Sequence, residues 1–479
     1  MWLSVATLIT LFFLTWKIPS DPDLFWHIRA GQDILKDGIP RIDWYTFTAP
    51  NFQWVNHEFA QDVVISWVHG LGGLRLVALF FSLIIAATLT VALRWSQPRQ
   101  LPWTLSLLSG LAIIGLSGSF IGARPQMFSY LFVLLLLGLL YKSRRQTWLT
   151  WLIPVLLLVW ANWHASFALG IVTILVFVGS EILTFLIPGN VLGKARAKKQ
   201  LLALSAVIPL SIGATFINPY GRGIWVETLR TLTDSELYKN IVEWFPSILQ
   251  KTNGKIFFGV AILAIFALVY KKTRPGLSTA AVLLVFFLAG ASGVRNIPLF
   301  LLVAIPLIAA TTYEWWPNLI TKISSWWPVL LVFSVAALLW IDATVPINKV
   351  WRINPTAQAY RDASYPVDAA SFLVEHSDQY QGARTFHSYA WGGYLLYRIP
   401  WFETFIDGRM PSWEYEGQKL IDQYFTIDRV DDDWREVFSK YAIDTVVVQT
   451  DHPLIPELQN DPKFSERYSD EQTIIFSSR

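Results

Sequence analysis

The sequence contains no cysteine among its 479 residues and carries little charge. Without cysteine, the chain can form neither a disulfide framework nor a thiolate metal site, and it has no thiol nucleophile. Charged residues make up 15% of the chain, whereas soluble globular proteins contain about 25%. The net charge of +3 is also too small to predict a nucleic-acid-binding protein. The composition therefore excludes thiol chemistry and a fully water-facing surface.

Apolar runs dominate the first 343 residues, in keeping with 53% hydrophobic residues and a mean hydropathy of +0.41. Residues 76–93 are 18 residues without a charge, which is typical of a transmembrane helix. Residues 62–93 exceed one span, so their first part is expected to lie along the membrane interface. The pair of spans on either side of Asn162 can also be drawn differently, which would change the number of spans. We predict about eleven spans, at residues 2–17, 62–93, 102–117, 126–141, 147–161, 166–187, 201–217, 256–270, 277–291, 297–312 and 327–343.

The last part of the chain lacks such runs and is rich in charge, proline and glycine. We therefore predict a mainly α protein, with a polytopic transmembrane helical bundle at 1–343 and outer loops at 18–61 and 218–255. A small soluble α/β domain is predicted to follow at 344–479. Helical and β-like patterns alternate in it: Val367–His376 and Asp432–Tyr441 are helical, and Thr404–Ile406, Ile443–Gln449 and Thr473–Phe476 are β-like.

Basic residues are scarce in one set of alternate loops, where the short loops contain only Arg124 and Arg295. The opposite loops are rich in lysine and arginine and should be cytoplasmic. The first loop and the C-terminal domain are then expected outside the cytoplasm. Residues 1–17 have no basic segment and no small-x-small cleavage site, so we expect a retained helix.

The first outer loop carries the most informative polar residues. Asp21 followed by Pro22 is typical of a helix N-cap with proline in the first turn. Asp23 and His27 are then four residues apart on one helical face. That spacing lets a carboxylate and an imidazole converge on a divalent metal such as Mg²⁺ or Mn²⁺. Alternatively, both acids only stabilise the helix N-terminus through its dipole.

A second acid and imidazole pair, His57-Glu58, comes later in the same loop. We group Asp23, His27, His57 and Glu58 as candidate metal ligands. The pair does not belong to a zinc-protease motif, because Gln61 stands where the second histidine would be.

Several further polar residues are predicted on the outer side of the membrane. An arginine within or beside an apolar run usually has a partner. For Arg124 and Arg295 that partner is either a structural carboxylate or a phosphate, which arginine binds bidentately. Asn162 and His164 lie between two spans, and Glu243 lies in a later outer loop. In Asn218-Pro219-Tyr220-Gly221, ordinary turn chemistry and helix termination account for Pro219 and Gly221.

Two glycine-containing patterns mark the C-terminal region, Trp391-Gly-Gly-Tyr394 and Asp407-Gly-Arg409. Their glycines either allow a sugar or pyrophosphate to approach the backbone, with aromatic rings stacking on the sugar, or form tight turns. The turn interpretation is preferred.

With these motifs in their order and topology, the chain resembles bacterial members of the GT-C superfamily of polytopic glycosyltransferases. The resemblance covers nearly the whole chain and implies transfer of a sugar from a polyprenyl-phosphate donor. It also implies a catalytic acid in the first outer loop, where Asp23 matches best and Asp21 second. Many members carry an adjacent Asp-Glu pair or a spaced acidic pair in that loop, whereas here Pro22 separates two aspartates. This departure leaves open which of Asp21 and Asp23 is the catalytic base, and whether the reaction needs a metal.

The predicted protein is thus a membrane glycosyltransferase of the bacterial cytoplasmic membrane, hexosyl or pentosyl and inverting, active in the cell envelope. Its partners are membrane lipids, the polyprenyl-phosphate-linked sugar and a glycan, lipid or protein acceptor. The candidate donor-phosphate residues are Arg124, Arg295, His164 and Asn162, and the candidate acceptor or accessory residues are Glu243, Trp391, Asp407 and Arg409. The alternatives are a flippase or transporter of a lipid-linked glycan, or a non-catalytic subunit of an envelope-polysaccharide assembly machine.

Overall fold

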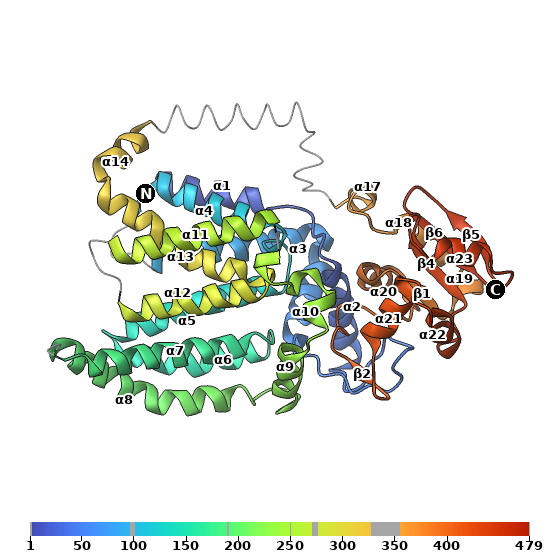
Figure 1. Cartoon of the computed structure of the whole chain (residues 1–479), viewed down its shortest axis with the longest axis horizontal. Helices are drawn as coiled ribbons and strands as arrows, with labels where there is room; N and C mark the ends of the chain where they lie inside the picture. The colour runs from blue at the N-terminus through green and yellow to red at the C-terminus, as the bar shows by residue number, and fades with distance from the viewer. Residues whose placement is uncertain are drawn as a thin grey trace. The chain divides into compact units, whose positions relative to one another are not determined.

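The computed structural model describes residues 2–95, 101–188, 191–249, 251–270, 276–326 and 355–478. The chain is mainly helical, and its internal contacts divide it into two compact units (Figure 1). We call the first the helical unit; it comprises Met1–Lys17, Ala78–Ile224 and Tyr238–Ile353. We call the second the mixed unit; it comprises Ile18–Val77, Trp225–Leu237 and Asn354–Arg479.

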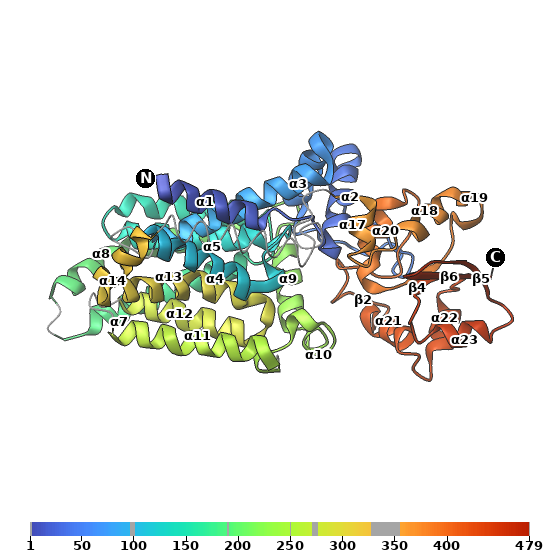
Figure 2. The same ribbon diagram turned by 90° about the horizontal axis from the view of Figure 1, so that it is seen from above.

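The helical unit is built from long apolar helices that run side by side (Figures 1 and 2). Helix α4 packs on α1 and α13, α13 also packs on α11 and α12, and α7 packs on α5, α8 and α12. The helices are α1 (Trp2–Thr15), the second part of α3 (Phe59–Trp95), α4 (Trp103–Ser117), α5 (Gln126–Ser143), α6 (Leu152–Ala161), α7 (Phe167–Leu186), α8 (Val191–Ala214), α10 (Leu237–Asn240), α11 (Lys251–Tyr270), α12 (Leu277–Ser292), α13 (Ile297–Trp315) and α14 (Pro317–Ser325). Short 3₁₀ turns lie between them: η1 (Gly118–Phe120), η2 (Thr147–Trp151), η3 (Val242–Trp244), η4 (Ser247–Leu249) and η5 (Val294–Asn296).

Four helical segments are long and apolar enough to cross a membrane: Phe59–Arg94, Gln126–Ser143, Phe167–Leu186 and Val294–Trp315. Shorter apolar helices cover Trp103–Ser117, Thr147–Ala161, Gly254–Tyr270 and Leu277–Ser292. The predicted span at 327–343 lies outside the described residues. Helix α3 is interrupted at Gly72 and Gly73, where Gly73 has a φ of 61°, so the predicted overlong segment is broken into two parts.

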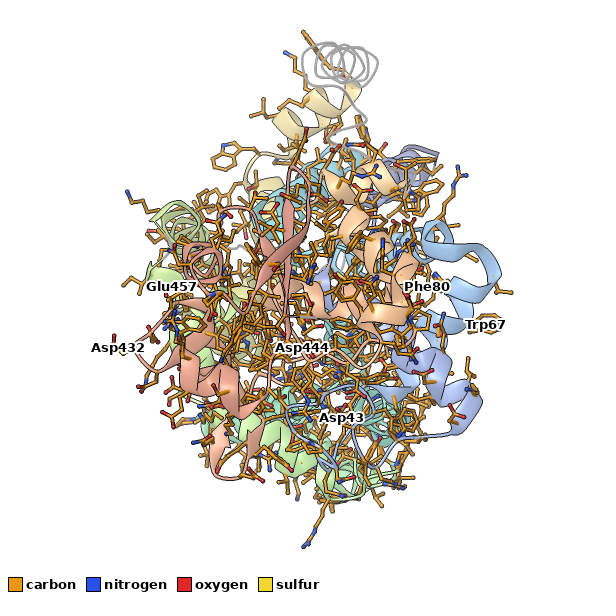
Figure 3. The ribbon with its side chains drawn as sticks, turned by 90° about the vertical axis from the view of Figure 1, so that its right-hand side faces the viewer. Asp43, Trp67, Phe80, Asp432, Asp444 and Glu457 are labelled. Atoms are coloured by element: carbon orange, nitrogen blue, oxygen red, sulfur yellow. The ribbon has the colours of Figure 1, made fainter. Side chains whose placement is uncertain are left out.

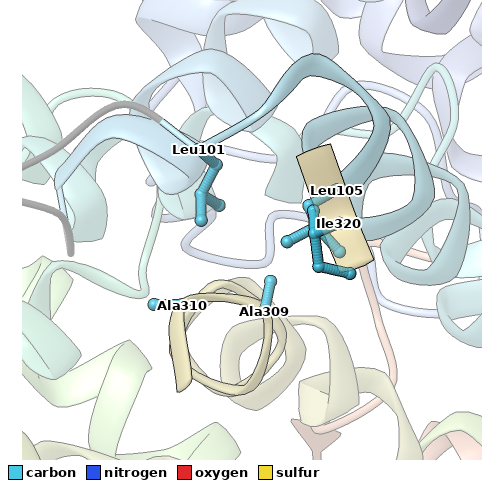
Figure 4. Close-up of a cluster of buried hydrophobic side chains, with 5 residues drawn as sticks. All are labelled: Leu101, Leu105, Ala309, Ala310 and Ile320. Carbon is cyan, nitrogen blue, oxygen red and sulfur yellow. The ribbon is translucent and has the colours of Figure 1, made fainter. Parts of the chain in front are cut away.

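One corner of the helical unit shows how small residues allow close helix packing. Ala309 and Ala310 of α13 face Leu101 and Leu105 at the start of α4, and Ile320 of α14 closes the cluster (Figure 4). All five side chains are buried. The small alanines let the helix backbones approach, as is common between helices in membranes.

The mixed unit combines short helices with a four-stranded sheet. Its helices are α2 (Pro22–Asp37), the first part of α3, α9 (Gly223–Thr233), α17 (Ala357–Arg361), α18 (Val367–Glu375), α19 (Ser377–Tyr380), η6 (Tyr389–Trp391), α20 (Gly392–Arg398), α21 (Leu420–Asp428), α22 (Trp434–Lys440) and α23 (Ile455–Gln459). The sheet strands are β1 (Thr385–His387), β4 (Thr445–Gln449), β5 (Ser465–Ser469) and β6 (Thr473–Ser477), and β2 (Glu414–Tyr415) pairs separately with β3 (Gln418–Lys419).

The sheet has the order β1-β4-β6-β5, with β1 parallel to β4 and the other neighbours antiparallel. Strands β4 and β6 are rich in Val and Ile and are almost wholly buried, which is why sequence alone predicts them. The predicted strand at Thr404–Ile406 is wrong, since Thr404 forms only an isolated bridge with Thr46. Strand β1 has only three residues, and edge strand β5 is mostly exposed, so neither carries a recognisable apolar pattern.

Within the mixed unit, the first loop (residues 18–61) is joined to the C-terminal segment, by which we mean residues 355–478. Thr404 N donates to Tyr45 O at 2.7 Å, and Thr48 Oγ1 donates to Phe405 O at 2.8 Å. Helix α2 packs along α20. The residues that we predict to carry chemistry in the first loop therefore share one core with the C-terminal segment.

Candidate functional site

The N-terminus of α2 has the cap that the sequence predicts. Asp21 has extended backbone angles, and its Oδ1 accepts a hydrogen bond of 3.0 Å from the backbone N–H of Asp23. Pro22 occupies the first helical position, where no N–H is needed. The carboxylate of Asp21 therefore has a structural role as the N-cap of α2.

Asp23 follows in the first turn and is half-buried. Its Oδ1 accepts a hydrogen bond of 3.3 Å from the indole N–H of Trp26. Gly408 of the C-terminal segment lies directly against this carboxylate. Asp23 is thus oriented by a neighbour on its own helix and by the backbone of a segment far along the chain.

His27 lies one turn further along α2 and is held by α3. Its Nδ1 donates to Asp62 Oδ1 at 2.6 Å, and Asn56 Nδ2 donates to Asp62 Oδ2 at 2.7 Å. Helices α2 and α3 meet closely because Gly31 of α2 has no side chain. A Cβ at this position would lie 2.6 Å from Ser66 Cβ of α3. The imidazole of His27 is 1% exposed, so Asp62 fixes both its tautomer and its ring orientation.

Glu58 lies between the two predicted histidine ligands. Its Oε2 is 3.9 Å from His27 Nε2 and 3.9 Å from His57 Nε2. Burial lowers the pKa of His27, but the charges of Asp62, Glu58 and Asp23 outweigh it and raise that pKa above its ordinary value. Burial lowers the pKa of His57 to about 4, so this imidazole is neutral at pH 7. The three side chains form an electrostatic cluster beside Asp23, in which His27 is buried and His57 and Glu58 are half-buried.

The predicted metal site is not assembled in this geometry. In the described part of the chain, no group of three or more His, Asp or Glu side chains is arranged to hold a metal ion. His27 Nδ1 is already bonded to Asp62, and its Nε2 faces Glu58. Asp23, His27, His57 and Glu58 lie near one another but do not fit a metal centre.

Arg409 is part of a buried ion network rather than a surface acceptor site. Its Nε and Nη2 donate to the two oxygens of Asp407 at 2.9 and 2.7 Å, and its Nη1 donates to Asp43 Oδ1. The guanidinium lies 4.8 Å from the ring centre of Tyr45 and 5.0 Å from that of Trp54. The side chains of the three charged residues are at most 1% exposed. We therefore correct the prediction that Asp407 and Arg409 contact an acceptor: their charges are satisfied internally.

Trp391 and the adjacent glycines also have packing roles. Trp391 is 3% exposed, and its indole N–H donates to Ser364 O at 2.8 Å, so it presents no face to a sugar. Gly392 and Gly393 begin α20 rather than a turn. A Cβ on Gly392 would lie 2.7 Å from Ile406 O, and one on Gly393 would lie 2.6 Å from Pro22 O. Neither the sugar nor the turn interpretation holds for these glycines; they permit close backbone contact.

Arg124 and Arg295 lie in the helical unit and differ in their partners. Arg124 Nη1 donates to Glu243 Oε1 at 2.7 Å, so the predicted accessory residue Glu243 is its carboxylate partner. The Arg295 guanidinium lies 4.6 Å from the ring centre of Trp244. Among the residues that the structure describes, no carboxylate lies within ion-pair distance of Arg295. All three charges act on the hydroxyl of Tyr130, so they gather around one point of the helical unit.

Asn162 and His164 make local contacts in the same unit. Asn162 Nδ2 donates to Leu158 O and to Ile217 O, both at 2.8 Å, and it ends α6. His164 Nδ1 accepts the backbone N–H of Ser166 at 3.0 Å. The Asn162 amide group thus joins two chain segments, and its role in donor binding stays a prediction.

His387 gives a pH-dependent prediction for the mixed unit. Its Nδ1 donates to Ser388 O at 3.0 Å, and its Nε2 accepts the Phe405 N–H at 3.3 Å. Burial lowers its pKa to about 4 from the ordinary 6.5. The unfolded chain therefore binds a proton more readily between these values, and stability is lost as the pH falls through that window. We expect the unfolding temperature to fall between pH 6.5 and 4, and to fall less in His387→Gln; equal falls in both proteins would contradict this.

Two residues that sequence reasoning missed organise the site. Asp62 orients His27, and Asp43 balances Arg409. Asp62 lies one turn after Glu58, so helical spacing could have singled it out. Asp43 gives no comparable signal, because its partner is 366 residues away.

Comparison with known proteins supplies the fold. No protein-family model matches the sequence, and no curated protein matches it. The oligosaccharyltransferase AglB of Archaeoglobus fulgidus, in complex with an inhibitory peptide and a dolichol-phosphate, is similar with a TM-score of 0.58 and 10% identity over 93% of this chain and 69% of that one. The same enzyme tethered with an acceptor peptide has a TM-score of 0.56 and 11% identity over the same shares. ArnT from Cupriavidus metallidurans in the apo state has a TM-score of 0.50 and 13% identity over 100% of this chain and 97% of that one. The chain is therefore a multi-pass membrane protein with the GT-C fold that its sequence predicts.

Proposed function

We propose that this chain is a membrane glycosyltransferase that moves a sugar from a polyprenyl-phosphate donor to an acceptor at the outer face of the bacterial cytoplasmic membrane. The observation that carries the proposal is Asp23, a half-buried acidic residue in the first loop of a GT-C fold. The outward orientation rests on the distribution of basic residues among the loops. A dolichol-phosphate bound by AglB supports a lipid phosphate as the donor carrier.

Asp23 is the better candidate for the base than Asp21. The Asp21 carboxylate caps α2 by accepting the Asp23 N–H, and the side chain is 9% exposed. Asp23 lies further into the first turn, where its Oδ1 accepts the Trp26 indole N–H, and the residue as a whole is less buried than Asp21. A general base must reach the proton that it removes, which favours the more accessible group.

In the proposed reaction, Asp23 accepts the proton of an acceptor hydroxyl. The oxygen of that hydroxyl attacks the anomeric carbon of the donor sugar at the same time. The new carbon–oxygen bond forms as the bond from the anomeric carbon to the phosphate oxygen breaks. The electron pair leaves with the polyprenyl phosphate, and the proton on Asp23 passes to water. A single displacement inverts the anomeric configuration. The transferred sugar would be a hexose or a pentose.

The leaving lipid phosphate needs charge neutralisation rather than protonation. Within the helical unit, Arg295 is the phosphate-binding candidate that we favour, because Trp244 orients its guanidinium and Glu243 is already paired with Arg124. Among the described residues of the mixed unit, no group of three or more His, Asp or Glu side chains is arranged to hold a metal ion.

Arg295 and Arg124 give a matched pair of variants for this assignment. We expect Arg295→Gln to weaken binding of undecaprenyl phosphate about tenfold to a hundredfold, the loss of charged hydrogen bonds. Arg124→Gln should have a smaller effect, because Glu243 already neutralises that charge. Binding is measured on the full chain in nanodiscs, with undecaprenol as the control that lacks phosphate. Equal affinities of Arg295→Gln and the unaltered protein would exclude this role.

The rival function is transport of a lipid-linked glycan without chemistry. Proteoliposomes containing a labelled undecaprenyl-phosphate sugar separate the two, since transfer changes the lipid and transport only moves it. The proposal predicts an acceptor-linked sugar that depends on Asp23. Lipid movement that survives Asp23→Ala and His27→Ala, without any product in the unaltered protein, would favour transport.

A further inference from the structure

Two glycines of the C-terminal segment lie against the first turn of α2. A Cβ on Gly408 would overlap Asp23 Oδ1 and would lie 2.6 Å from Asp23 Cγ and 3.2 Å from Oδ2. A Cβ on Gly393 would lie 2.6 Å from Pro22 O and 3.3 Å from Trp26 Cδ1. Neither glycine has a positive φ. These positions therefore require glycine for space and not for backbone conformation.

The backbone at Gly408 has little freedom to retreat. Its neighbours Asp407 and Arg409 are joined by a bidentate ion pair, and Arg409 is also bonded to Asp43 of the first loop. The backbone N–H of Arg409 adds a hydrogen bond of 2.9 Å to Asp407 Oδ1. The ion network thus anchors Gly408 on both sides.

We propose that Gly408 is a positioning residue that fixes the Asp23 carboxylate, so that the C-terminal segment forms one wall of the catalytic site. The inference rests on the proposed function and assigns the C-terminal segment a part in it. Trp26 fixes Asp23 Oδ1 from the helix side, and the Gly408 backbone limits rotation of the carboxylate from the other side. The segment acts through Asp23 and need not touch the substrate.

The two glycines should respond differently to alanine because different atoms oppose them. At Gly408 the opposing group is the end of a side chain, which can rotate away from a methyl group. The fold then survives, but the carboxylate leaves its position. At Gly393 the opposing atom is a backbone carbonyl oxygen, which cannot rotate away without moving the helix. Gly408→Ala should therefore affect turnover, and Gly393→Ala should affect stability.

The first test compares glycine-to-alanine variants of the full chain in nanodiscs, with undecaprenyl-phosphate-linked sugars as donors and an envelope extract as the acceptor. We expect Gly408→Ala to lower kcat about a hundredfold, as misplacing a catalytic group by about 1 Å does, with an unchanged KM for the donor and an unfolding temperature near that of the unaltered protein. Gly70→Ala is the control, because nothing lies within 4 Å of its Cβ position in the same unit. Full activity of Gly408→Ala would overturn the inference.

The second test places Gly408→Ala in an Asp23→Asn background. If Gly408 acts through Asp23, the double variant should be no slower than Asp23→Asn alone, whereas an independent structural effect would add to the loss. Additive losses would overturn the inference. An Asp23→Asn protein with full activity would instead defeat the proposed function, whereas inactive Asp23→Asn with fully active Gly408→Ala would defeat only the positioning role.

Discussion

Replacing Asp23 with asparagine is expected to lower kcat for sugar transfer about 10²- to 10⁴-fold, the usual contribution of a general base. The amide oxygen can still accept the Trp26 indole N–H, so the first turn of α2 keeps its hydrogen bond. What is lost is the ability to take a proton from the acceptor hydroxyl. The unfolding temperature should therefore stay close to that of the unaltered protein. The measurement is steady-state transfer by the purified full chain alongside its thermal unfolding.

Asp21 provides the matched control for this change. Asparagine caps helices about as well as aspartate, so Asp21→Asn should retain both the cap on α2 and most of the transfer activity. Asp21→Ala loses the hydrogen bond to the Asp23 N–H and should cost about 1 kcal/mol of stability. A large loss of kcat in Asp21→Asn, with an active Asp23→Asn, would reverse the assignment of the base.

Removing the Arg409 guanidinium is expected to have the largest effect on stability. Arg409→Met would leave Asp43 and Asp407 without their partner, and the side chains of both are 0% exposed. Breaking a buried pair in this way costs about 3–5 kcal/mol, because the remaining charge stays buried. The same residues anchor Gly408 beside Asp23. Loss of the network should therefore lower the unfolding temperature and the transfer rate together.

Arg435 is the matched control in the same unit. It pairs with Glu457 at 2.8 Å, but the two side chains are 58% and 40% exposed. Glu457 and Asp432 lie at the edge of the view in Figure 3, whereas Asp43 lies among other side chains. An exposed pair contributes at most about 1 kcal/mol, so Arg435→Met should be nearly neutral. If Arg409→Met were as stable as Arg435→Met, the anchoring role of the network would be wrong.

Local patterns in the sequence predict much of this structure. Asp21 and Pro22 predict the start of α2, and the apolar runs of β4 and β6 predict the two central strands. Apolar runs predict the apolar helices of the helical unit, because burial in lipid demands long stretches without charge. In each case the physical cause lies within a few neighbouring residues.

Contacts between distant segments are not predictable in this way. Arg409 looks like an exposed binding residue in the sequence because Asp43, its partner, lies in the first loop. Gly408 does lie in a turn, as predicted, in which Met410 N donates to Asp407 O at 3.0 Å. The atoms that require Gly393 and Gly408 to be small belong to Pro22 and Asp23, which the sequence does not reveal. Sequence spacing says nothing about which segments approach each other. The placement of the site in the first loop therefore stays a prediction, and the contact of Gly408 with Asp23 was not predictable from the sequence.

The central claim is tested most directly by measuring acceptor-dependent release of undecaprenyl phosphate from an undecaprenyl-phosphate-linked sugar by the purified full chain. The account predicts equal amounts of released lipid phosphate and acceptor-linked sugar, with Asp23→Asn at the background rate. Failure to release lipid phosphate from every hexose and pentose donor tried, by a protein that moves the intact lipid across a bilayer, would contradict it.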